Sequence, residues 1–181
     1  RLRFGTRARA TKPGEVIRAG VCGPFCYSFS KYRYFVLFKD DYSGFRFVYF
    51  MKEKSELPVK LSWMLANCKT VGQKVTMLLS DNGGEFDNAE VRKILHENGI
   101  RQSLIMPYTP QQNCCSQREN RTLVDAARAM RLAHQELPQV LWAELIQTAA
   151  YILNRTAPTC VEGKSPYELW YNQKPRITHL R

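Results

Sequence analysis

The segment SDNGGEF at residues 80–86 is the feature that most constrains this chain. The short apolar run at residues 74–80 leads into this segment and has the length of a buried strand. The sequence therefore predicts that Asp81 lies at the carboxyl end of a strand. Thirty-five residues, 82–116, separate Asp81 from Gln117, which begins the stretch QRENRT near the start of a predicted helix. The pattern therefore indicates an acidic residue at the end of a strand and, at a defined distance along the chain, a polar residue near the start of a helix.

Composition favours a folded, basic domain. The chain has 181 residues, 44% of them hydrophobic, which is enough for one domain with a substantial core. The net charge of +11 favours a polyanionic partner, with nucleic acid as the leading candidate and a merely solubilising surface as the alternative. Residues 1–12 carry five basic and no acidic side chains, so they are predicted to form a flexible arm in front of a single domain at 13–181.

The sequence also excludes some classes of protein. No apolar run approaches the roughly 20 residues that a membrane-spanning helix needs, so no membrane partner is expected. The six cysteines form no CxxC pair, and reduced thiols in an intracellular protein are the simplest interpretation.

Hydrophobic periodicity and turn residues predict alternating strands and helices, which define an α/β fold. Strands are expected at 15–22, 33–40, 44–51, 74–80 and 101–105. Helices are expected from Ser55 to about Lys69, from 87 to 98, from a cap at Ser116, from Pro138 to about Asn154, and over 166–171, with an exposed connection at 106–113.

Several stretches together resemble the integrase catalytic core of Copia-type retrotransposons, part of their Pol polyprotein, in the ribonuclease H-like superfamily. The resemblance extends from about Thr11 to the C-terminus, and it implies a mixed five-stranded sheet flanked by helices. The matching stretches are FKDDYSGFRFVYFMKEKSE, SDNGGEF, MPYTPQQN, RENRTLVDAARAM, LWAELIQTAAYILNR and GKSPYELWYNQKP.

This resemblance implies three carboxylates that hold two Mg²⁺ or Mn²⁺ ions for DNA strand transfer. The family pattern HADVCGP aligns with RAGVCGP here, so Gly20 occupies the first acidic position. Asp81 retains the second and is the expected metal ligand, whereas Gln117 replaces the glutamate of the pattern QNGxSERxNRT. Cys114 replaces a glycine of that pattern, which raises the question of a positive φ there.

Three other carboxylates are candidates to take over metal binding: Asp40, Asp41 and Glu119. Asp40 and Asp41 fit a strand end and turn better. Glu119 lies about 200° around the helix from position 117, and its spacing from Ser116 instead predicts a capping box at the helix N-terminus.

The resemblance further implies contact with retroelement and target DNA and action in the nucleus. It is also compatible with a homo-oligomer. Three functions remain: a degenerate integrase core that binds DNA without catalysis, an active transferase with substitute carboxylates of its own or of another protomer, and a host-recruited DNA-binding module. The residues expected to contact nucleic acid are Arg118, Arg121, Arg128, Arg131, Tyr108, Gln111, Gln112 and Asn113.

Overall fold

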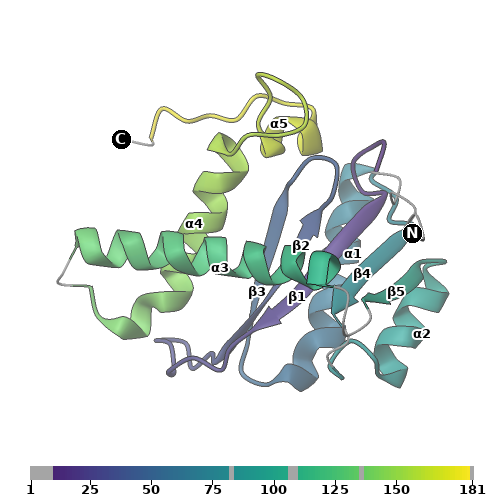
Figure 1. Ribbon diagram of the computed structural model, residues 1–181, viewed down its shortest axis with the longest axis horizontal. Coiled ribbons are helices and arrows are strands. Elements are labelled where there is room, and N and C mark those ends of the chain that lie inside the picture. Colours follow the sequence, from purple (N-terminus) through teal and green to yellow (C-terminus); the bar gives the residue numbers. More distant parts are fainter. Residues whose placement is uncertain (1–9, 82–83, 106–109, 135–136, 180–181) are drawn as a thin grey trace.

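A five-stranded mixed sheet forms the centre of the protein, as a computed structural model shows (Figure 1). The structure describes residues 10–81, 84–105, 110–134 and 137–179, and at 81, 105 and 110–116 it describes the backbone alone. The strand order is β3-β2-β1-β4-β5, with antiparallel pairing from β3 to β1 and parallel pairing from β1 to β5. The strands are β1 (Val16–Cys22), β2 (Tyr34–Asp40), β3 (Arg46–Met51), β4 (Met77–Asp81) and β5 (Arg101–Ile105).

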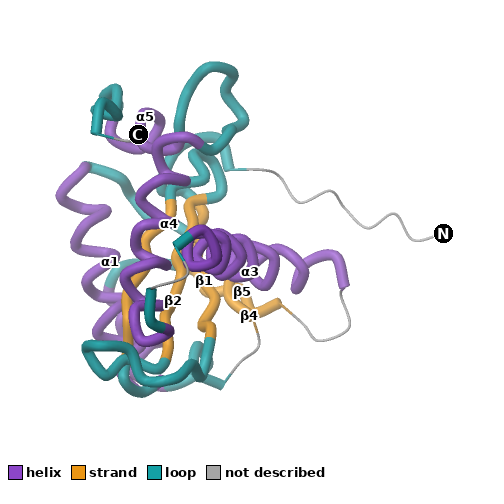
Figure 2. Tube along the Cα trace, turned by 90° about the vertical axis from the view of Figure 1, so that its left-hand side faces the viewer, coloured by secondary structure: helices purple, strands orange, loops and turns teal. Residues whose placement is uncertain are grey.

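Helices cover both faces of this sheet. Figures 1 and 2 show α1 (Leu57–Val71) and α3 (Pro110–Ala133) on opposite sides of the strands. The side of α1 also carries α2 (Ala89–Glu97) and α5 (Pro166–Tyr171), and these helices share one apolar core with β1 and β2. On the other side, α3 and α4 (Trp142–Thr156) pack on β2 around a second core that contains Leu123 and Ile146.

The predicted fold class and all five strands are confirmed, but three helix starts were wrong. A 3-10 turn at Lys54–Glu56 precedes α1, so Ser55 does not cap that helix. Another 3-10 turn at Gln139–Leu141 precedes α4. The third helix, α3, begins at Pro110 and not at a cap on Ser116, because proline suits the first turn of a helix and no helix breaker follows it.

The early start of α3 changes the interpretation of two residues. Ser116 and Glu119 lie inside the helix, so the predicted capping box does not form there. Cys114 has helical backbone geometry, so its position does not require the positive φ for which a glycine would be needed. Residues 110–113, expected in an exposed connection, belong to the first turn of α3.

Candidate functional site

Gly20 and Asp81 lie side by side at the centre of the sheet. The parallel register of β1 and β4 pairs Val16 with Met77 and ends with Ala19 opposite Ser80, so the next residues along each strand are Gly20 and Asp81. This juxtaposition agrees with the alignment that places Gly20 at the first acidic position. Gly20 is not among the glycines with a positive φ, so its backbone conformation is one that an aspartate can adopt.

The third position of the family pattern, Gln117, lies on α3. The N-terminal part of this helix crosses β1 and β4 (Figure 1). Gln117 is exposed, and its amide offers a neutral oxygen where the family pattern has a carboxylate. One turn further on, Asn120 is buried, and its Oδ1 has no hydrogen-bond partner among the residues that the structure describes. Of the three positions at which the sequence resemblance predicts acids, only Asp81 therefore carries a negative charge.

This donor set does not fit two divalent cations. Such ions prefer several charged oxygen ligands, and two of them bring a charge of +4 to the site. Gly20 supplies no ligand, and Gln117 supplies no charge. Among the side chains that the structure describes, no three His, Cys, Asp or Glu groups gather in a way that could hold a metal ion.

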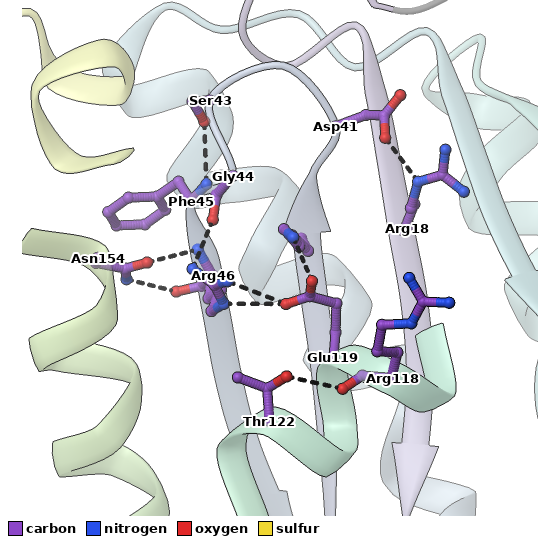
Figure 3. A network of polar contacts seen from close by, with 11 residues as sticks. Arg18, Asp41, Ser43, Gly44, Phe45, Arg46, Arg118, Glu119, Thr122 and Asn154 are labelled. Atoms are coloured by element: carbon purple, nitrogen blue, oxygen red, sulfur yellow. Dashed lines mark hydrogen bonds and ion pairs between the residues drawn. The ribbon is translucent and has the colours of Figure 1, made fainter. Parts of the chain in front are cut away.

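Glu119 is bound elsewhere, in a network of charges that joins α3 to the sheet (Figure 3). Its Oε1 accepts a hydrogen bond from Lys39 Nζ of β2 at 2.6 Å, and its Oε2 accepts one from Arg46 Nη2 of β3 at 3.0 Å. The backbone N–H and C=O of Arg46 in turn bond to the side-chain amide of Asn154 on α4, both at 2.8 Å. Arg46 thus connects α3 and α4 to the same strand.

Burial and pairing oppose each other in this network. Burial alone raises the pKa of Glu119, but the hydrogen bond and charge of Lys39, with the charge of Arg46, outweigh it and hold that pKa below its usual value. Burial also lowers the pKa of Lys39, which Glu119 partly offsets. Glu119 is therefore an ionised partner of two cations, which argues against its use as a substitute metal ligand.

The other two substitute candidates also have structural partners. Asp40 is fully buried at the end of β2, where its carboxylate accepts hydrogen bonds from the N–H of Gly14 and from both the N–H and hydroxyl of Ser43. Burial raises its pKa despite these bonds. Asp41 pairs with Arg18 Nε at 2.6 Å (Figure 3). Both residues agree with the interpretation as strand-end and turn residues.

We expect Asp40→Ala to lower the free energy of unfolding by about 2–4 kcal/mol, because it leaves three buried donors without an acceptor. Thermal or urea denaturation followed by circular dichroism measures this loss. Asp125→Ala is the matched control, because Asp125 is half-exposed, and it should change stability by less than about 1 kcal/mol. A loss at Asp40 no larger than that of the control would contradict the assigned role.

The predicted arginines lie along the exposed side of α3, with differing surroundings. Arg121 and Arg128 are exposed and flank Asp125 at 3.4 and 3.6 Å. Arg121 follows Gln117 by four residues, so both project from the same side of the helix. Arg118 instead borders a cleft of about 530 Å³ that Arg18, Lys39 and Glu119 also line, and Arg131 borders a separate, smaller pocket.

The remaining predicted contacts cannot be placed. Tyr108 and the N-terminal arm at residues 1–9 lie outside the described residues, and only the backbone is described for Gln111, Gln112 and Asn113. Sequence reasoning missed the network partners Arg46 and Asn154, which lie 108 residues apart. The sequence did offer one sign of this network: Arg46 is a cation in the otherwise apolar stretch FRFVYF. The structure shows that it is buried.

The sheet order, the covering helices and the acidic strand end define a ribonuclease H-like core of the integrase class. Residues 10–110 match the integrase core domain family, and the chain belongs to that family. It is 34% identical over 169 residues to the Pol polyprotein of transposon TNT 1-94 of Nicotiana tabacum, and 29% identical over 175 residues to that of transposon RE2 of Arabidopsis thaliana. These matches cover 92% and 95% of the chain but 13% and 12% of the polyproteins. The resemblance to Copia-type Pol proteins is confirmed.

Solved structures support the same fold. The chain superposes on a chain of a simian T-cell lymphotropic virus intasome in complex with PP2A regulatory subunit B56 gamma, with a TM-score of 0.72 at 20% identity, over 96% of this chain and 59% of that one. It superposes on the HTLV-2 integrase catalytic core domain in complex with magnesium with a TM-score of 0.65 at 20% identity, over 90% and 99% of the two chains. No helix within the described residues is long and apolar enough to span a membrane.

Proposed function

We propose that this integrase core-like domain of a retrotransposon Pol protein binds nucleic acid but does not catalyse strand transfer. The observation that carries the proposal is the composition of the catalytic positions. Gly20 adjoins Asp81 on the neighbouring strand without contributing a ligand, and Gln117 contributes only a neutral oxygen. Glu119, the acid nearest in sequence to position 117, is engaged by Lys39 and Arg46.

Electrostatics explains why such a site loses its chemistry. Two-metal catalysis needs one cation to activate the attacking oxygen and a second to stabilise the leaving oxygen. Magnesium is bound by the HTLV-2 core, and in this chain Asp81 is the position that would hold a divalent ion. A single carboxylate offsets only about a quarter of the charge of a metal pair, so we propose that Mg²⁺ or Mn²⁺ binds weakly and singly.

The test of lost catalysis is an assay of the purified chain with Mn²⁺ or Mg²⁺ and labelled retroelement-end DNA. We expect strand transfer at background level. Transfer above background would contradict the proposal and support the alternative, in which carboxylates of another protomer complete the site. That alternative has one supporting observation, since the HTLV-2 core is known in dimeric and trimeric forms.

DNA binding should survive, because it depends on distributed cations and not on three exact ligands. The exposed side of α3 that bears Gln117 continues through Arg121 and Arg128, so DNA that approaches the catalytic positions would meet both guanidinium groups. We expect the double variant Arg121→Ala, Arg128→Ala to weaken DNA binding and to reduce the slope of log K against log salt by about 2. Fluorescence anisotropy with a labelled duplex at several salt concentrations measures the slope.

The matched control is the double variant Arg92→Ala, Lys93→Ala. It removes the same charge from α2, which lies on the opposite side of the sheet from α3, and both side chains are exposed. The control should leave the salt slope within about 0.5 of the starting value if DNA uses the α3 side. Equal slopes for the two double variants would show that net charge alone attracts the DNA.

The proposal extends to assembly and location. We propose that the chain forms a homo-oligomer and, when it acts on DNA, does so in the nucleus. Sedimentation of the purified chain at several concentrations tests the first statement, and the distribution of a fluorescent fusion tests the second. A monomer at all concentrations, or a fusion excluded from the nucleus, would contradict the corresponding statement.

A further inference from the structure

A cleft of about 530 Å³ lies between α3, the end of β2 and the loop that follows α4. Arg118 and Glu119 of α3 line one side of it, and residues 158–160 of the loop line another. The thiol of Cys160 donates a hydrogen bond to the C=O of Tyr42 at 3.2 Å, which holds this loop to the turn after β2. The cleft is therefore bordered by three elements that the fold brings together.

The cleft does not coincide with the catalytic positions. Glu119 lines the cleft and lies about 200° around α3 from Gln117, so the two side chains leave the helix in opposite directions. Neither Gln117 nor Gly20 is among the described residues that line the cleft. A ligand in the cleft would thus occupy a site of its own.

The ion pairs around the cleft contain more cations than carboxylates. Arg18 Nε pairs with one oxygen of Asp41 at 2.6 Å. Glu119 is shared by Lys39 at 2.6 Å and Arg46 at 3.0 Å, so one carboxylate serves two cations. Over these described side chains, three cations face two carboxylates, and one positive charge is in surplus.

Arg118 adds a second surplus charge to this count of described side chains. It is exposed, and Figure 3 shows its side chain extending from α3 toward the pair of Arg18 and Asp41. The side chains of Arg18 and Lys39 are 25% and 21% exposed, so a ligand can reach both, while water screens them less than fully exposed charges. Burial lowers the pKa of Lys39, and like charges that line one cleft repel, so an anion bound there would be favourable.

The surplus of charge and the size of the cleft select the class of anion. Phosphate oxygens accept charge-assisted hydrogen bonds from ammonium groups and fit the planar fork of a guanidinium group. A phosphate monoester carries about −1.5 to −2 at pH 7, which matches the surplus, whereas a phosphodiester carries a single charge. A cleft of about 530 Å³ is as large as many small-molecule sites, so it also has room for the group that bears the phosphate.

We propose that this cleft binds a phosphate monoester, whose phosphate lies between Arg18, Lys39 and Arg118. The monoester is either a small phosphorylated molecule or the 5′-phosphate at a nucleic-acid end, because both present the same dianionic group. The site differs from the proposed DNA surface, where Arg121 and Arg128 meet phosphodiesters on the side of α3 that bears Gln117. A carboxylate ligand fits less well, since it brings one charge and two oxygens to three cations.

The test uses the full chain, labelled with ¹⁵N, in a buffer without phosphate or sulfate at about pH 8, where the monoester is a dianion. The probes are methyl phosphate and its matched diester, dimethyl phosphate, which carries one charge. We expect methyl phosphate to bind about tenfold or more tightly than dimethyl phosphate in an NMR titration. The amide shift changes should centre on residues 39–44 and 158–160. Equal affinities for the two esters would overturn the proposal, as would shift changes confined to residues 121–128.

A pair of variants tests the role of the charge. Arg118→Gln removes one surplus charge from an exposed position and should weaken methyl phosphate by about tenfold. The matched control Arg92→Gln removes the same charge from an exposed position on α2 and should leave that affinity unchanged. An equal effect of the two variants would contradict the assigned site. The comparison of the two esters needs no variant, so it decides even where Arg118→Gln fails to fold.

Two duplexes of one sequence, with 5′-phosphate or 5′-hydroxyl ends, distinguish the two sources of the phosphate. If the cleft takes a nucleic-acid end, the phosphorylated duplex should bind about tenfold more tightly to the starting chain and no more tightly to Arg118→Gln. Equal binding of the duplexes, with methyl phosphate still bound, assigns the cleft to a small phosphorylated molecule. The 5′-hydroxyl duplex reports DNA binding through Arg121 and Arg128 by itself, so either proposal can fail without the other.

Discussion

The double replacement Gly20→Asp and Gln117→Glu is expected to raise Mn²⁺-dependent strand transfer from background by about a thousandfold or more. The reason is electrostatic: the two changes add two negative charges and several oxygen ligands where Asp81 alone faces the metals. Gly20 lies in regular strand geometry beside Asp81, so the new aspartate does not have to adopt a left-handed backbone conformation. Because the three carboxylates act as a unit, each single replacement should recover far less than the pair.

Calorimetric titration with Mn²⁺, followed by the strand-transfer assay with labelled DNA ends, measures both effects. Two ions should bind to the double variant, and at most one weakly to the starting chain. The single variants Gly20→Asp and Gln117→Glu serve as controls for the added charge. Two well-held ions in the starting chain would refute the proposed loss of catalysis. An inactive double variant that folds and binds DNA would show that another departure, such as Cys114, also blocks the reaction.

The positions of the strands were predictable because they rest on local patterns. Residues 33–40 and 44–51 are two runs rich in aromatic and apolar residues, separated by turn residues at 41–43, and the short apolar run before Asp81 has the length of a buried strand. In these elements local preference and tertiary structure agree. The parallel register of β1 and β4, which brings Gly20 and Asp81 onto adjacent strands, is a tertiary feature that the sequence patterns did not predict.

The start of α3 and the role of Glu119 were not predictable in the same way. Ser116 and Glu119 satisfy a capping-box pattern, yet the helix continues through them from Pro110, since a local pattern does not report what precedes it. The true partners of Glu119 are Lys39 and Arg46, which are 80 and 73 residues away. Pairings between charges so far apart arise from the fold and leave no periodic signal in the sequence.

The proposed loss of two acids is compatible with the observed fold. The catalytic carboxylates of an integrase serve metals, and three like charges close together do not stabilise the folded state without them. On the proposed function, Gly20 and Gln117 in place of two acids remove a repulsion. The orientation of α3 depends instead on Glu119, whose loss should be costly.

We accordingly expect Glu119→Gln to lower the free energy of unfolding by about 2–4 kcal/mol, which for a domain of this size corresponds to a fall in Tm of roughly 4–16 °C. The reason is that Lys39 and the largely buried Arg46 lose their counter-charge while they stay in the interior. Denaturation by heat and by urea measures the effect. The control Glu144→Gln, on the exposed side of α4, should change stability by less than about 0.5 kcal/mol.

The pH dependence of stability distinguishes a charge effect from a shape effect in this variant. The pKa of Glu119 lies below its unfolded value, so its contribution is complete above that unfolded value, near 4.3, and is lost as the pH falls through the lower folded pKa. Burial raises the pKa of Asp40, so the contribution of Asp40 to the free energy of unfolding changes in the opposite direction as the pH falls through the same acid range. Because Glu119→Gln removes only the first contribution, its stability should decline less steeply below pH 4.3 than that of the starting chain. Parallel acid declines would show that Glu119 contributes through packing and not through its charge.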